Sequence, residues 1–241
     1  MKKLLLFLLL TSVFYPKNYA QLVAGDIAFI GMNTDTQEGY TFITLADIPG
    51  FEKIYFTDRG IASNTNWGPS TEGTYLFTAP ASGIPCGTIV NFIETSADVL
   101  TIDGVVGASM VLQQGSFNLG SGDQIIAYQK TTPGVSTTIS DATFIAAITS
   151  DYDAICVNSI TGWTQDACVS STSESKLPPG LINGTHAVSM TPTGPEKDNF
   201  RYNGTLTGTS TAIRLLINDH TNWLNNNGPS TSTIFDNSPK A

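Results

Sequence analysis

The chain has 241 residues, with 20 acidic residues against 11 basic ones and a formal net charge of −9. An acidic surface repels nucleic-acid phosphates and anionic lipid headgroups, so we expect no nucleic-acid partner. Only 13% of the residues are charged, whereas Thr, Ser, Asn and Gly are abundant. This composition is typical of an extracellular β-protein with many turns and unlike that of a helical enzyme.

Residues 1–20 have the pattern of a secretory signal peptide. Met1-Lys2-Lys3 is followed by an apolar run from Leu4 to Leu10, and the small residue Ala20 marks a cleavage point. The apolar run is shorter than the roughly 20 residues that span a bilayer, so we expect no membrane span. The predicted location is secreted or extracellular, with the periplasm and the outer surface as alternatives.

The mature chain is dominated by short predicted strands. Residues 27–32 are an apolar run and residues 40–45 combine apolar and polar residues; in an extended chain the successive side chains of each segment lie on opposite faces. Further strands are predicted at 54–58, 74–78, 87–93, 99–102, 109–112, 124–129, 142–148 and 186–190. Asp103-Gly104 lies between two of these segments and is a favoured hairpin turn pair.

One short helix is predicted near the C-terminus. Ser210 or Thr211 is a suitable cap, and Ile213, Leu216 and Ile217 form an apolar stripe at helical spacing. Strands and helices do not alternate, so we predict an all-β, antiparallel β-sandwich. Residues 21–224 form this single domain, and residues 225–241 are expected to be a loosely ordered tail.

The chain contains three cysteines. Cys156 and Cys168 enclose eleven residues, and a disulfide between them is permitted in an exported protein. By loop-closure entropy such a bridge contributes about 2–3 kcal/mol. Cys86 is then the odd cysteine, and we expect it to be a buried free thiol.

One loop offers a weak calcium site. Asn33, Asp35, Gln37 and Glu38 carry side-chain oxygens at nearly alternate positions, and Ca²⁺ takes six to eight oxygen ligands. The loop lacks the glycine and the distal glutamate of the familiar calcium loop, so a solvated hairpin turn is the alternative. No other cofactor is expected.

The tryptophans provide the main hint of binding. Trp67 and Trp163 lie among Asn, Thr and Gly, and flat aromatic rings on such loops stack on sugar rings. The alternative is that they close the ends of the sandwich, which is the role that we assign to Trp223.

No catalytic motif is evident. The chain contains no Gly-x-Ser-x-Gly, His-Glu-x-x-His or phosphate-loop pattern. The 20 acidic residues leave open a carboxylate pair for glycoside hydrolysis. Asp58 and Asp123 stand at predicted strand ends and are interpreted as turn-forming residues.

Several stretches together resemble a known family. AGDIAFIG at 24–31, IYFTD at 54–58 and SGDQIIAYQ at 121–129 resemble an uncharacterised secreted β-sandwich domain of Bacteroidota and cyanobacteria. A more distant similarity is to the lamin-tail domain, through residues 40–45, 54–58 and 122–128. These resemblances imply an immunoglobulin-like sandwich and no particular activity.

The expected function is a secreted, non-catalytic binding or adhesion module. Its partner would be a glycan, the matrix or another extracellular protein. An extracellular hydrolase with a carboxylate pair and a structural component of a surface assembly are the alternatives.

Overall fold

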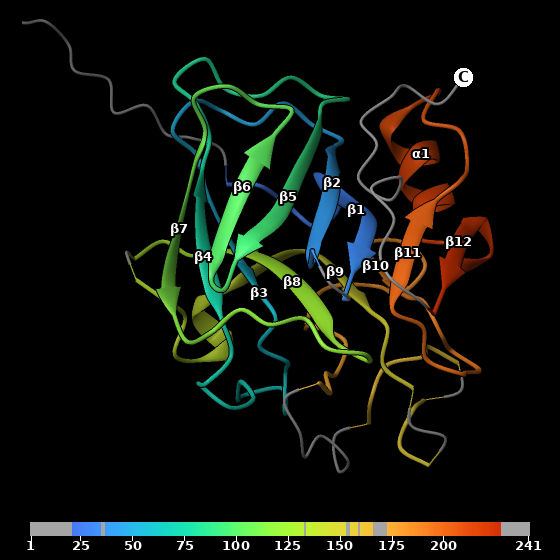
Figure 1. The fold of residues 1–241 in the computed structure, drawn as a ribbon. Helices are drawn as coiled ribbons and strands as arrows, with labels where there is room; N and C mark the ends of the chain where they lie inside the picture. Colours follow the sequence, from blue (N-terminus) through green and yellow to red (C-terminus); the bar gives the residue numbers. More distant parts are fainter. Residues whose placement is uncertain are drawn as a thin grey trace, which may run out of the picture.

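The computed structural model describes residues 21–34, 37–132, 134–152, 155–158, 160–165 and 173–227. Two six-stranded sheets pack face to face (Figure 1). The first sheet has the order β12-β11-β1-β2-β5-β6. Its strands are β1 (Ile27–Asn33), β2 (Gly39–Thr44), β5 (Ile89–Ser96), β6 (Val99–Asp103), β11 (Asn199–Tyr202) and β12 (Trp223–Asn226).

The second sheet has the order β10-β9-β8-β3-β4-β7. Its strands are β3 (Lys53–Thr57), β4 (Thr74–Thr78), β7 (Ser109–Gln114), β8 (Gln124–Gln129), β9 (Thr143–Thr149) and β10 (Ala187–Ser189). All pairs of strands are antiparallel except β9 with β10. The prediction of an all-β sandwich is confirmed.

Aromatic rings fill the space between the sheets. Phe42 on β2 stacks on Phe56 on β3 with ring centroids 5.4 Å apart, and Tyr40 lies 4.8 Å from Phe92 on β5. The alternation of strand side chains places these rings on the inner faces, and the large aromatic surfaces that they bury are the main stabilising contribution.

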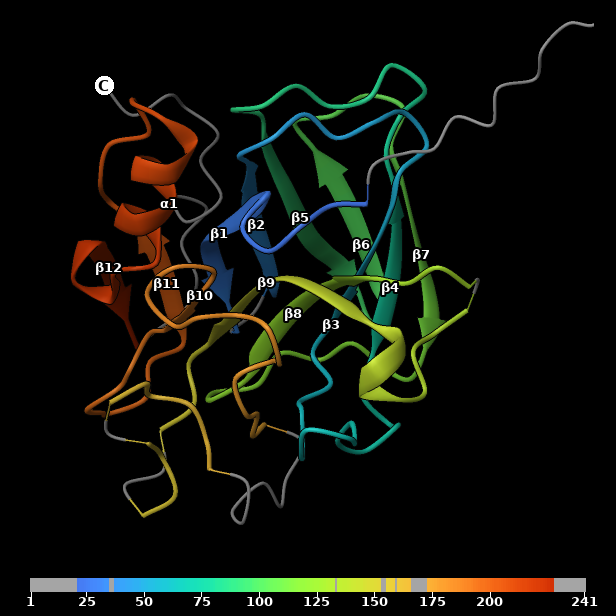
Figure 2. The same ribbon diagram turned by 180° about the vertical axis from the view of Figure 1, so that it is seen from behind.

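The predicted helix is α1 (Ser210–Ile217), which lies beside β11 and β12 (Figures 1 and 2). The Thr209 side chain caps it by accepting a hydrogen bond from the Ala212 N–H, one residue before the expected caps. Ile213 and Ile217 are buried as the stripe predicts, whereas Leu216 is 38% exposed. Two short 3-10 helices, η1 (Ile139–Asp141) and η2 (His220–Asn222), complete the described elements.

The second sheet also carries apolar side chains on its outer face. Tyr128 on β8 and Phe144 on β9 are buried there, beneath loops that contribute Trp67, Trp163 and Leu181. This outer cluster is separate from the core between the sheets. The β8 strand pairs antiparallel with both of its neighbours, β3 and β9. Both of its faces are therefore buried, one in the core and one beneath the outer cluster.

Two local predictions are wrong. Asp103-Gly104 does not form a hairpin turn, because the strands on either side of it, β6 and β7, belong to different sheets. The hairpin is formed by β5 and β6, and Asp98 in its turn has the left-handed conformation with a φ of 59°. Asn225 and Asn226 belong to β12, where they pair with β11, and not to a loose tail.

Residues 1–20 and 228–241 lie outside the described residues. Within the described part of the chain, no helix is both long and apolar enough to cross a bilayer.

Candidate functional site

An exposed phenylalanine stands at the tip of a tight turn before β3. The Glu52 N–H donates to the Pro49 carbonyl at 3.2 Å, so Pro49 to Glu52 form a β-turn, and Phe51 at its third position has a φ of 64°. Glycine or asparagine normally occupies a third turn position with positive φ, because a side chain there is strained by about 1–2 kcal/mol. Phe51 is nevertheless 62% exposed, so burial of its ring does not offset this strain.

The turn lies beside a small polar hollow. The hollow has a volume of about 270 Å³ and is lined by Gln21, Phe51, Glu52, Lys53, Gln129, Lys130 and Thr131. Gln129 is fixed at both ends of its amide group, because its Oε1 accepts from the Leu22 N–H and its Nε2 donates to the Lys53 carbonyl, each at 2.8 Å. The hollow therefore combines one exposed aromatic ring with side chains that donate and accept hydrogen bonds.

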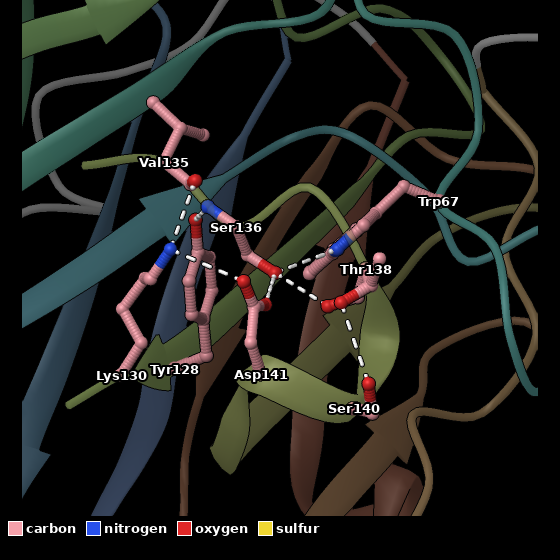
Figure 3. Close-up of polar contacts among 8 residues, drawn as sticks. All are labelled: Trp67, Tyr128, Lys130, Val135, Ser136, Thr138, Ser140 and Asp141. Atoms are coloured by element: carbon pink, nitrogen blue, oxygen red, sulfur yellow. Dashed lines mark hydrogen bonds and ion pairs between the residues drawn. The ribbon is translucent and has the colours of Figure 1, made fainter. Parts of the chain in front are cut away.

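Lys130 is held at the edge of this hollow by an ion pair (Figure 3). Its Nζ donates to the Asp141 Oδ2 at 3.2 Å and to the Val135 carbonyl at 3.0 Å. Partial burial tends to raise the pKa of Asp141, but the hydrogen bond from Ser136 and the charge of Lys130 outweigh it and lower that pKa. Asp141 is therefore ionised over the ordinary pH range and fixes the Lys130 ammonium.

Ser136 connects this ion pair to the outer cluster. Its Oγ accepts from the Trp67 Nε1 at 3.0 Å and contacts the Asp141 carboxylate, and its N–H donates to the Tyr128 hydroxyl at 3.3 Å. The Trp67 ring packs against Tyr128 and Phe144, with centroids 5.3 and 5.7 Å away. Ser136 is 1% exposed, so its hydroxyl anchors a loop and does not meet a substrate as a nucleophile.

The two tryptophans predicted to bind sugar do not have open ring faces. Trp67 is 7% exposed and Trp163 is 1% exposed, and the Trp163 Nε1 donates to the Asn183 Oδ1 at 2.9 Å. The expectation of exposed rings is wrong because the polar loops that carry them fold over the outer face of the second sheet. Phe51 is the exposed aromatic that we did not single out, and the only signal for it was the Pro-Gly pair that precedes it.

The calcium prediction finds no support among the described residues. The Asn33 Nδ2 donates to the Gln37 carbonyl at 2.8 Å, and the Glu38 Oε2 accepts from the Leu119 N–H at 2.6 Å. The first bond closes the β1–β2 turn, and the second joins Glu38 to the segment between β7 and β8. Asp35 lies outside the described residues, and within them no group of three or more His, Cys, Asp or Glu side chains is able to hold a metal.

Cys86 is exposed, so the expectation that it is buried is wrong. It follows Pro85 in a connection before β5, and its Sγ lies 3.6 Å from the Ser210 Oγ at the start of α1. Cys86 also lines a groove of about 590 Å³, whose large apolar lining residues are Ile43, Leu45, Ile89, Leu206 and Ile213. Cys168 lies outside the described residues, so its disulfide with Cys156 stays a prediction.

Asp58 and Asp123 are both buried at the ends of strands. Asp123 forms the predicted turn, because its Oδ2 accepts from the Gly120 N–H at 3.1 Å and its Oδ1 from the Gln124 N–H at 2.9 Å. Asp58 accepts from the Asn118 N–H at 3.0 Å. Neither of them lines the polar hollow or the apolar groove, and among the described residues Glu52 is the one acid that lines the hollow.

A scan against protein-family models, a search of curated proteins and a search of solved structures each returned no match to this chain. The resemblance to a secreted domain family and to lamin-tail domains therefore stays a prediction.

Proposed function

We propose that the protein is a secreted, non-catalytic binding module that holds a glycan against Phe51. The observation that carries this proposal is the exposed aromatic ring at a strained turn position beside the polar hollow. Strain that burial does not offset persists where function requires it. An apolar ring face with amide, carboxylate and ammonium groups around it matches a sugar, which presents C–H groups on one face and hydroxyls at its edge.

The hollow favours binding over hydrolysis. A glycosidase of the usual kind needs two carboxyl groups on opposite sides of the scissile bond, about 5–10 Å apart. Glu52 is one carboxylate at the hollow, and no second acid of the described residues lines it. The buried pair Asp58 and Asp123 is bound to backbone N–H groups and lies away from the hollow.

A depletion assay tests this proposal. Purified residues 21–241 are mixed with a panel of insoluble polysaccharides, and both the protein lost from solution and the sugar released are measured. We expect loss of protein without release of sugar, and a Phe51→Ala variant should bind about tenfold more weakly or worse.

Two control variants test whether the aromatic ring at position 51 is what binds the polysaccharide. Phe51→Tyr should retain binding, and Val106→Ala, at a 98% exposed apolar residue elsewhere, should leave it unchanged. Release of sugar would favour the hydrolase. If none of the polysaccharides removes the protein from solution, a protein partner or a structural role is favoured instead.

A further inference from the structure

The segment that connects β7 to β8 closes one end of the core. Phe117 and Leu119 in this segment are buried, whereas Asn118 between them is exposed. The Phe117 ring lies 5.9 Å from the Tyr40 ring and 5.4 Å from the Tyr75 ring, so it contacts both sheets. Release of this segment would open the core to water.

Four consecutive backbone N–H groups of this segment each donate to a different carboxylate. The Phe117 N–H donates to Asp98 at 2.7 Å, Asn118 to Asp58 at 3.0 Å, Leu119 to Glu38 at 2.6 Å and Gly120 to Asp123 at 3.1 Å. The four acids come from the β5–β6 turn, the end of β3, the start of β2 and the start of β8. We refer to Glu38, Asp58, Asp98 and Asp123 as the acid clasp.

The surroundings of the acid clasp are acidic as well. The charged or titratable groups that face it from the packed elements are Tyr40, Glu72, Tyr75, Glu94 and, next to Gly122, Glu196. Arg59 follows Asp58 in sequence, but its Nε donates to the Gly68 carbonyl at 2.8 Å and its guanidinium lies over Trp67. Among the described residues, no basic side chain contributes to the pKa shifts of Glu38, Asp58 and Asp123.

Three buried oxygens within this region lack a hydrogen-bond partner. They are the Asp58 Oδ1, the Tyr40 hydroxyl and the Tyr75 hydroxyl, on residues that are 0%, 0% and 2% exposed. The Gly73 N–H is near enough to Asp58 to lower the pKa of its carboxyl, yet it does not make a hydrogen bond to Oδ1 of normal geometry. A buried carboxylate with a bare oxygen and acidic neighbours requires a neutralising partner.

The raised pKa values of the acids favour a proton as that partner. Burial, followed by the charge of Asp123, raises the pKa of Asp58 well above its ordinary value, and burial likewise raises that of Asp123. Burial raises the pKa of Glu38 to about 7, helped by Glu94 and Asp98 and opposed by the Leu119 N–H. A metal is not favoured, because the described residues form no group of three ligating side chains.

We propose that the acid clasp is a pH-sensitive latch, which holds residues 117–120 when Glu38, Asp58 and Asp123 are protonated and releases them when mild alkalinity ionises these three acids. Two or more carboxylates ionised together in this buried region repel each other. The segment between β7 and β8 is the connection that all four of them hold.

The direction of the pH effect follows from the raised pKa values. For Glu38, Asp58 and Asp123, between the ordinary pKa of the acid and its raised value, the folded protein retains a proton that the unfolded chain has already released. The contribution of these three acids to stability is therefore fully present below about pH 4 and is lost as the pH rises, first through the Glu38 pKa of about 7 and then through the higher values of Asp58 and Asp123.

Thermal unfolding of residues 21–241 between pH 5 and pH 9 tests the latch. We expect the Tm of the unmodified protein to fall by about 5 °C or more over this range. Asp58→Asn and Glu38→Gln mimic the protonated acids and should each reduce this fall. The matched control is Asp47→Asn, an exposed acid that likewise accepts from a backbone N–H, that of Cys86 at 2.8 Å, and it should leave the fall unchanged. A constant Tm, or the same fall in all four proteins, overturns the proposal.

A local measurement distinguishes release of the segment from general loosening. Chymotrypsin, with its activity normalised at each pH, should cut after Phe117 or Leu119 at pH 8.5 and not at pH 6.5. Glu38→Gln should slow this cleavage, which keeps the test informative if Asp58→Asn does not fold. Cleavage that begins elsewhere in the chain argues against the latch. Ca²⁺ at about 1–10 mM is enough to fill a weak extracellular calcium site. If it fully restores the Tm at pH 9, a cation and not a proton neutralises the acids, and the proposal is overturned.

Discussion

Two loops of this molecule are held by carboxylates in opposite electrostatic settings. Asp141 holds the 131–142 loop with Lys130 as its counter-ion and the Ser136 hydroxyl as a donor, and its pKa is lowered. The acid clasp holds residues 117–120 without a basic partner among the described residues, and the pKa values of Glu38, Asp58 and Asp123 are raised. Burial of the carboxylate, weighed against the hydrogen bonds and charges around it, therefore decides at which pH a carboxylate stabilises a loop.

The largest effect is expected where the Asp141 loop meets the outer cluster. Trp67→Ala removes a buried indole from between Tyr128 and Phe144 and should cost about 3–5 kcal/mol in the free energy of unfolding, measured by urea denaturation. Phe51→Ala is the control, because it removes an exposed aromatic ring and should change stability by less than about 0.5 kcal/mol. Equal losses in the two variants would mean that the outer cluster is not a packed layer.

A smaller effect is expected from the hydroxyl that connects Trp67 to Asp141. Ser136→Ala leaves the buried Trp67 N–H without its acceptor and should cost about 1–3 kcal/mol in the same measurement. Ser140→Ala, which removes an exposed hydroxyl 3.3 Å from the Thr138 Oγ1, should be nearly neutral. If the two serines behave alike, Ser136 is not the link between the ion pair and the indole.

The smallest effect on stability is expected for Asp141→Asn, and it tests the difference in pH dependence between the two loops. Asp141→Asn should cost about 1 kcal/mol at neutral pH, because the ion pair is partly exposed. The folded pKa of Asp141 is lowered, so its contribution is present above its ordinary pKa of 3.8 and is lost as the pH falls through the folded value. The gap between this variant and the unmodified protein should therefore close in acid, whereas the gap for Glu38→Gln should open in alkali. Gaps that change in the same direction would remove the distinction between the two loops.

The fold class followed from local pattern, because a short apolar or alternating run is a property of neighbouring residues. Residues 27–32 and 40–45 belong to β1 and to β2 with its flank, as predicted. The layer over the outer face of the second sheet did not follow. Its loops are polar in composition, and the burial of Trp67 and Trp163 depends on residues far away in the sequence, such as Phe144 and Asn183.

The candidate site was predictable in part. The Pro-Gly pair before Phe51 indicates a turn, but a left-handed φ on an aromatic residue is contrary to residue preference and cannot be expected from sequence. The acid clasp is less predictable still, because Glu38, Asp58, Asp98 and Asp123 are 20 or more residues apart and share no motif. Asp123 was correctly interpreted as a turn residue, since its role is local.

Because the acid clasp contacts main-chain N–H groups, it requires an N–H at each position of residues 117–120 but no particular side chain. Asn118 is exposed, and a side chain on Gly120 would meet nothing within 4 Å. In related chains these two positions should accept almost any amino acid except proline, which alone lacks the N–H donor. Natural variants of this protein would then keep the four acids while the residues that they grip drift.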